Sequence, residues 1–231
     1  MTTLLSLPVD ILRYHIFTKK GLDDSSLAMS SMVCKRIREV MPNNKRKAYI
    51  GDAVESGHLG IVQWLRTKGS PWDSWTCAHA ARKGHLEMLQ WLISNGCPWN
   101  DWVWSQAARK GYLNVLQWLK VNGYPCNNHS LYSQAAFKGH LEVLKWLRAN
   151  GVPCDEFACS QAAAGGHLKV LQWLRANDCP WDQSICIVAA RNGHLEVLQW
   201  AKANGCHWNK EACLDYCSND YQHVIAWINA Q

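Results

Sequence analysis

Tryptophan recurs along this chain at an almost constant interval, and this interval restricts the fold more than any other feature. Fourteen of the 231 residues are tryptophan. Seven of them are separated by steps of 27 residues, with one step of 28, and a Gly-His or Gly-Tyr pair stands shortly before six of the seven. A repeat of this length is typical of a solenoid or array. The seven are Trp64, Trp91, Trp118, Trp146, Trp173, Trp200 and Trp227.

One unit, residues 75–99, predicts two helices. Residues 75–83 are rich in alanine, and Gly84 is typical of the residue that ends a helix. Residues 85–95 carry leucine at every third position, so the leucines share one helical face. Gly96 and then Pro98 end this second helix. Each unit is therefore expected to be helix–turn–helix–loop.

Stacking of these units predicts an all-α helical repeat solenoid of about seven helix–turn–helix repeats, covering residues 45–231. One helix pair cannot bury its own apolar face, whereas stacked pairs cover one another. Alanine pairs such as Ala107-Ala108 allow the first helices to approach closely. We expect the tryptophans of the second helices to stack into a ladder. Four tryptophans in the loops are expected to belong to the core: Trp72, Trp99, Trp181 and Trp208.

Composition and termini narrow the class of protein. Hydrophobic residues make up 48% and charged residues 18% of the chain, which favours a folded protein over a disordered one. The first residues lack the basic and apolar regions of a signal peptide, and no apolar stretch is long enough to cross a bilayer. We expect a soluble protein of the cytoplasm (of the host cell, if the source is viral), with the nucleus as the alternative, and no membrane partner.

The eleven cysteines and the recurring histidines are expected to be structural. An odd cysteine count and the lack of an export signal argue for reduced thiols. Equivalent residues of stacked helices lie about 8–10 Å apart, too far for a disulfide or for shared metal ligands. The sequence shows no phosphate-binding glycine loop, nucleophile elbow or carboxylate pair. It predicts no enzyme activity, no catalytic residue, no metal and no cofactor.

The segment from Ala189 to Trp200, followed by Asn204-Gly205, resembles an ankyrin repeat. The resemblance covers about residues 45–231 and recurs in seven registers. Ankyrin repeats usually run about 33 residues, so these are shorter, and the missing residues fall where the family has its β-hairpin fingers. Short-finger repeats of this type are similar to those of amoeba-infecting giant viruses and some protists. The resemblance implies a protein-binding scaffold.

The concave helical surface is the partner-binding surface that this resemblance implies. Gln106, Gln134 and Gln161 precede the alanine pairs of three first helices and need not pack in the core. Basic residues at the ends of first helices form a column that is interrupted at Ala164: Arg82-Lys83, Arg109-Lys110, Lys138 and Arg191. Solvated charge is the default interpretation of such a column, an acidic partner is the alternative, and it is too sparse to favour nucleic acid. The arginines assigned to this surface are Arg82, Arg109 and Arg191.

Residues 1–42 do not share the repeat and predict a helical hairpin. Their text, with Leu-Pro and an acidic residue near the start and Val-Cys-Lys-Arg near the end, resembles an F-box. An F-box docks on the Skp-family adaptor of a cullin–RING ubiquitin ligase, while a second domain captures the substrate. The alternative is a cap that covers the end of the solenoid. The residues expected to contact an adaptor are Leu7, Pro8, Ile11, Leu12 and Val33.

These features together predict a protein–protein interaction scaffold that acts as the substrate-recruiting receptor of a cullin–RING ligase. A plain ankyrin-type binding protein with no ubiquitin role is the alternative.

Overall fold

Stacked helix pairs build the whole described part of the chain. The computed structural model describes residues 46–67, 69–126 and 130–231. The first helices of the seven pairs are α3 (Arg46–Glu55), α5 (Ser74–Lys83), α7 (Trp102–Lys110), α9 (Leu131–Phe137), α11 (Ala158–Ala164), α13 (Ser184–Arg191) and α15 (Lys210–Tyr216). The second helices are α4 (Leu59–Thr67), α6 (Leu86–Ser94), α8 (Leu113–Val121), α10 (Leu141–Ala149), α12 (Leu168–Ala176), α14 (Leu195–Ala203) and α16 (Gln222–Asn229).

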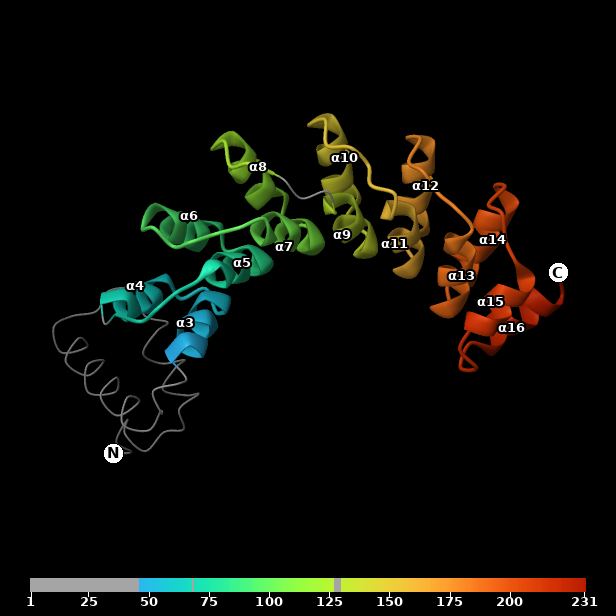
Figure 1. Ribbon diagram of the computed structural model, residues 1–231, viewed down its shortest axis with the longest axis horizontal. Helices are drawn as coiled ribbons and strands as arrows, with labels where there is room; N and C mark the ends of the chain where they lie inside the picture. The colour runs from blue at the N-terminus through green and yellow to red at the C-terminus, as the bar shows by residue number, and fades with distance from the viewer. Residues whose placement is uncertain (1–45, 68, 127–129) are drawn as a thin grey trace, which may run out of the picture.

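The pairs form an arch (Figure 1). From α5 to α13, the first helices line the inner side of the arch and the second helices its outer side. Each first helix packs against the first helix of the next pair. The predicted all-α repeat solenoid is therefore confirmed.

Glycine ends the first helix and begins the turn, as the sequence predicts. Gly84 has a φ of +71°, in the left-handed region that a residue with a Cβ rarely adopts. There its N–H donates to the carbonyl of Ala81, and the next N–H, that of His85, donates to the carbonyl of Ala80. These two bonds satisfy carbonyl groups that a helix end leaves open, so the second helix can start at once.

An aromatic residue, histidine or tyrosine, follows the glycine of the turn, and its ring packs against the turn glycine of the preceding repeat. A Cβ atom built on Gly111 would lie 2.6 Å from Nδ1 of His140 in the next repeat, and one on Gly84 would lie 2.5 Å from the ring of Tyr112. Only a residue without a side chain leaves room for these rings. The structural role predicted for the histidines is confirmed, with the added finding that their contacts run between repeats.

The core has one layer from each kind of helix. Ala107 and Ala108 of α7 are completely buried, which lets α5 and α9 approach α7 closely. Leu116 and Leu119 of α8 are also completely buried. Each repeat thus completes the core of its neighbours, as a solenoid requires.

The predicted ladder of second-helix tryptophans is wrong. Trp91 and Trp200 each contact a loop tryptophan, Trp72 and Trp181 respectively, with ring centroids 6.0 Å and 5.8 Å apart. In these two pairs the ring partner of the second-helix tryptophan is therefore a loop tryptophan and not the tryptophan of the next second helix. The predicted core role of the loop tryptophans is confirmed, since all four are partly buried against the core.

The fingers of longer repeats are missing, as expected. In the three described ranges the chain has no β-strand, and the loop after α6 reaches α7 within a few residues. The inner surface of the arch is consequently formed by helix side chains rather than by hairpin tips.

Candidate protein-binding surface

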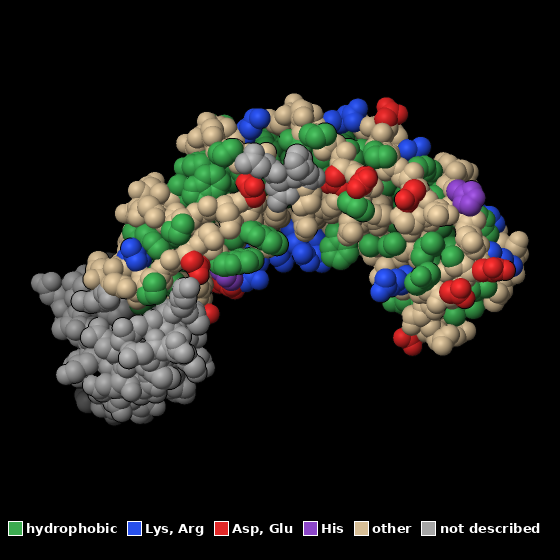
Figure 2. All heavy atoms as spheres, in the orientation of Figure 1, with side chains coloured by type: hydrophobic (Ala, Val, Ile, Leu, Met, Phe, Trp, Pro, Cys, Tyr) green, Lys and Arg blue, Asp and Glu red, His purple; other side chains and the backbone are tan. Residues whose placement is uncertain are grey.

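A first helix such as α7 has three side chains, about one turn apart, that point away from the core. On α7 these are Trp102, Gln106 and Arg109: the glutamine is half-buried and the other two are exposed. The residues between them, including Ala107 and Ala108, are buried. The spacing of four and three residues places all three on one face of the helix. Figure 2 shows Lys and Arg side chains gathered on the inner edge of the arch, where this face lies.

Loop side chains hold the first of these three positions in place. The Oδ1 atom of Asn100 accepts a hydrogen bond of 3.1 Å from the N–H of Trp102. Oδ1 of Asp155 accepts an equivalent bond of 3.0 Å from the N–H of Phe157. Such turns, in which an Asx side chain caps the backbone two residues later, begin the helix and direct the aromatic side chain outward. Phe157 is 58% exposed as a result.

A pocket lies on the inner surface where α7, α9 and α11 meet. Its volume is about 420 Å³. The lining combines two aromatic rings, two amides, one hydroxyl and one guanidinium: Phe137, Phe157, Gln134, Gln161, Ser133 and Arg109. The lining offers two apolar rings beside four polar side chains, so the pocket can contact both an apolar group and polar groups of a ligand.

Arg82, one of the arginines predicted for this surface, is already paired. Its guanidinium binds the carboxylate of Glu55, which also contacts His79 and lies 3.7 Å from Nζ of Lys83. Partial burial opposes ionisation of Glu55, but the positive charges of Arg82, His79 and Lys83 outweigh it and lower the pKa of this carboxyl. The charge of Arg82 is therefore largely balanced within the chain.

Arg109 is in a different electrostatic environment. Its guanidinium lies 5.8 Å from the ring centroid of Phe137, and Nζ of Lys138 lies 4.8 Å from the same ring. Among the described residues, no carboxylate forms an ion pair with Arg109. Arg191, at the end of α13, does not line the pocket. The predicted basic column continues from Arg109 to Lys138, whose Nζ lies near the Phe137 ring, and is interrupted at Ala164, before Arg191.

The structure brings together only part of the predicted surface. Gln134, Gln161 and Arg109 line the pocket, whereas Gln106, Arg82 and Arg191 do not. Sequence reasoning missed three lining residues: Ser133, Phe137 and Phe157. Alignment of the repeats could have identified Phe157, because it occupies the same repeat position as Trp75 and Trp102. Both tryptophans are also about half exposed, at 49% and 47%.

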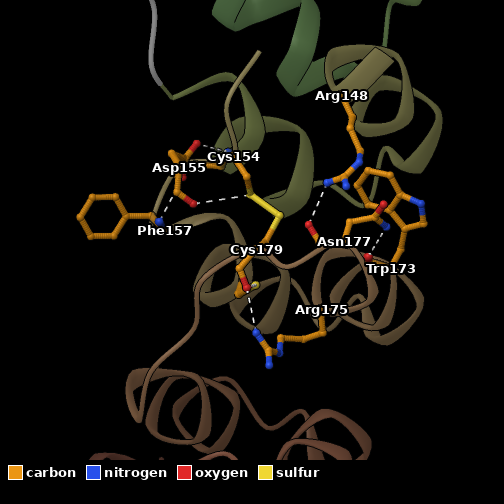
Figure 3. The surroundings of a disulfide bond; sticks show 10 residues. Arg148, Cys154, Asp155, Phe157, Trp173, Arg175, Asn177 and Cys179 are labelled. Carbon is orange, nitrogen blue, oxygen red and sulfur yellow. Dashed lines mark hydrogen bonds between the residues drawn. A yellow bond between two sulfur atoms is a disulfide. The ribbon is translucent and has the colours of Figure 1, made fainter. Parts of the chain in front are cut away.

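A disulfide joins the loops on either side of α11 and α12 (Figure 3). Cys154 and Cys179 are bonded, with Cα atoms 5.9 Å apart. The expectation that all cysteines are reduced is therefore wrong. Equivalent positions of stacked repeats lie too far apart for a disulfide, but these two cysteines occupy different positions in successive loops, which brings their Cα atoms within disulfide range.

The disulfide lies beside the carboxylate that holds Phe157. Asp155, the neighbour of Cys154, accepts hydrogen bonds from the N–H of Ser133 at 2.9 Å and from the N–H of Phe157 at 3.0 Å (Figure 3). One loop is thus attached to α9 through Asp155 and to the following loop through Cys154. Both attachments restrain the backbone that presents Phe157 to the pocket.

The remaining predicted residues and sites can be placed briefly. Leu7, Pro8, Ile11, Leu12 and Val33 lie outside the described residues. Within the described ranges, no three His, Cys, Asp or Glu side chains are grouped so that they could hold a metal ion. No helix in these ranges has the length and apolar character needed to cross a membrane.

Comparison with known proteins agrees with this architecture. A family model described as ankyrin repeats (many copies) matches residues 52–93, 77–119, 132–175 and 159–201. The crystal structure of the human ASB11 ankyrin repeat domain is similar, with a TM-score of 0.57 and 17% sequence identity over 77% of this chain and 96% of that chain. At this identity the likeness concerns the fold alone. A search of curated proteins found no match.

Proposed function

The chain belongs to the ankyrin-repeat family, a family of protein–protein interaction scaffolds, and from this premise we propose that it recruits a substrate protein to a cullin–RING ubiquitin ligase. The inner surface of the arch binds the substrate. The observation that carries this role is the pocket lined by Arg109, Phe137 and Phe157. An exposed phenylalanine beside a guanidinium that has no ion-pair partner among the described residues is typical of a protein interface. Ankyrin scaffolds are typically not enzymes.

The F-box-like text of residues 1–42 supports the ligase part of the proposal. Leu7, Pro8, Ile11, Leu12 and Val33 are the residues assigned to the Skp-family adaptor. A substrate receptor needs two parts, a segment that binds the adaptor and a domain that binds the substrate.

Adaptor capture tests this proposal. The full-length chain is expected to bind a purified Skp-family adaptor, and a chain that starts at Lys45 is not. The double variant Leu7→Asp/Leu12→Asp should lose adaptor binding, because two carboxylates would have to be buried in an apolar contact. The matched control, Thr2→Asp/Thr3→Asp, adds the same charge outside the motif and should bind like the wild type.

Equal adaptor binding by the full-length and truncated chains would contradict the ligase role. Residues 1–42 would then be only the cap of the solenoid, and the protein a binding scaffold with no ubiquitin role.

A further inference from the structure

We propose that the pocket between α7, α9 and α11 recognises a partner segment in which an apolar side chain stands within two residues of an aspartate or glutamate. This inference rests on the proposed protein-binding role of the inner surface and specifies the chemistry of its ligand.

The apolar part of the pocket predicts the first element of the ligand. Phe157 exposes 58% of its surface, although the Asp155 carboxylate and the nearby disulfide restrain the backbone around it. Phe137 lines the same pocket from α9. Two phenylalanine rings held by ordered backbone lose little conformational freedom on binding, so burial of a leucine-sized or aromatic side chain against them is favourable.

The amide groups predict an extended or loop segment around that side chain. Gln134 and Gln161 lie at the same position of α9 and α11, and both line the pocket. Within the described ranges, neither side-chain amide has a hydrogen-bond partner from the chain. Each amide offers both donor and acceptor atoms, so together they can pair with peptide N–H and C=O groups that no helix or strand of the partner already uses.

The charges predict the acidic element. None of the residues that line the pocket is acidic, and the nearby carboxylate of Asp155 is engaged by the N–H groups of Ser133 and Phe157. Arg109 has no ion pair among the described residues, in contrast to Arg82, which Glu55 neutralises. Lys138, whose Nζ lies 4.8 Å from the centroid of the Phe137 ring, adds to the positive potential. A carboxylate of the partner is a group that a guanidinium can bind in a bidentate manner, and no described residue supplies one to Arg109.

Selection from a display library of random dodecapeptides against the full-length chain tests the inference. The retained peptides are expected to be enriched in Asp or Glu within two residues of Leu, Ile or Phe. The same selection against Arg109→Glu should lose this enrichment and favour Lys or Arg instead. The control variant Lys120→Glu reverses an equally exposed charge on α8, outside the pocket, and should retain the acidic preference.

Affinity measurements on the enriched peptides provide the second test. Fluorescence anisotropy with the most enriched peptide should show binding at least about tenfold weaker for Phe157→Ser and for Arg109→Glu than for the wild type. Tyr216→Ser is the matched control, because Tyr216 is 59% exposed on α15 and lies outside the pocket. It should bind like the wild type.

Peptides without a paired acidic and apolar residue, or an enriched peptide that binds Arg109→Glu and Phe157→Ser with unchanged affinity, would overturn the inference. A selection that retains no peptide would also overturn it. None of these results affects adaptor capture by residues 1–42, so the two proposals fail separately.

Discussion

The Nε2 atom of His140 lies 3.1 Å from the carbonyl oxygen of Arg109, although the two residues belong to different repeats. Because a carbonyl only accepts, the Nε2–H group donates. The same bond recurs along the arch, joining His85 to Glu55, His167 to Phe137 and His194 to Ala164. The second helices α6, α10, α12 and α14 are thus each attached at their start to the first helix of the preceding repeat.

A side chain at Gly111 should weaken this attachment. In Gly111→Ala the new Cβ would meet the His140 ring at 2.6 Å and would have to tolerate a φ of +78°. We expect a loss of about 3 kcal/mol in the free energy of unfolding, measured by urea denaturation. Gly123→Ala is the control, because its φ is +71° but nothing lies within 4 Å of the Cβ position. It should lose only about 1 kcal/mol, and equal losses would contradict the role of the ring.

Acidification should destabilise the protein through His140. Burial lowers the pKa of this imidazole below its ordinary value, and the charges of His167, Lys110 and Lys138 lower it further, against the effect of the hydrogen bond to Arg109. The unfolded chain therefore takes up the proton first. The contribution of His140 to stability is constant above its unfolded pKa of about 6.5 and falls as the pH drops from there toward the folded pKa.

The variant His140→Tyr isolates this effect, since Tyr112 and Tyr221 occupy the same position in other repeats. Urea denaturation at about pH 7.5 and about pH 5.5 should show a smaller loss of stability for the variant than for the wild type. An identical pH dependence of the two proteins would show that His140 is not responsible.

Removal of a loop tryptophan should cost more than removal of an exposed one. Trp181 packs edge-on against Trp200, and the guanidinium of Arg175 lies 4.3 Å from its ring centroid. We expect Trp181→Ala to lower the free energy of unfolding by about 2–3 kcal/mol. Trp102→Ala, at a side chain 47% exposed, should cost about 1 kcal/mol or less in the same denaturation experiment. The reverse order would show that the loop rings are not part of the core.

Reduction of the disulfide should lower stability to that of Cys154→Ser. Cys154 and Cys179 are 25 residues apart, and a cross-link closing a loop of that size stabilises by about 3 kcal/mol. Without reductant, Cys154→Ser should unfold at lower denaturant than the wild type, and with dithiothreitol the two should coincide. Cys126→Ser, at the same place in the preceding loop, should follow the wild type in both conditions. A wild-type protein insensitive to dithiothreitol would contradict the prediction.

The inner-surface glutamines should affect binding without affecting stability. The triple variant Gln106→Glu/Gln134→Glu/Gln161→Glu should stay within about 0.5 kcal/mol of the wild type per site in a denaturation experiment, because none of the three is buried. It should weaken binding of a partner on this surface. A variant that melts normally and keeps every partner would move recognition to the outer helices or to the N-terminal segment.

Local chemistry explains which features could be predicted from the sequence. Helix ends at Gly84 and Gly96 depend on backbone preferences of single residues, and the alanine and leucine faces depend on spacing within one helix. The helix ends and the buried faces each depend on residues close together in the sequence, and both predictions are confirmed. The inner-surface position of Gln134 and Gln161 followed from the same register.

Features between repeats were harder to predict. The disulfide joins Cys154 and Cys179, whose separation of 25 residues differs from the repeat length, so a comparison of equivalent positions could not find it. The ring partner of Trp200 is a loop residue, Trp181, and not the tryptophan of a neighbouring second helix. Phe157 lines a pocket only because residues of α9 lie beside it, and the spacing of residues in the sequence does not predict this contact between repeats.

The missing fingers affect how substitutions can change the binding specificity of the protein. Without hairpin tips, each repeat shows a partner little more than three first-helix side chains, such as Trp102, Gln106 and Arg109 on α7. The glycine, histidine and alanine contacts that hold repeats together use other positions. Specificity and folding are therefore separable at the level of single residues. A chain of this design can acquire a new partner by substitution within one repeat, while the arch that carries the new surface stays the same.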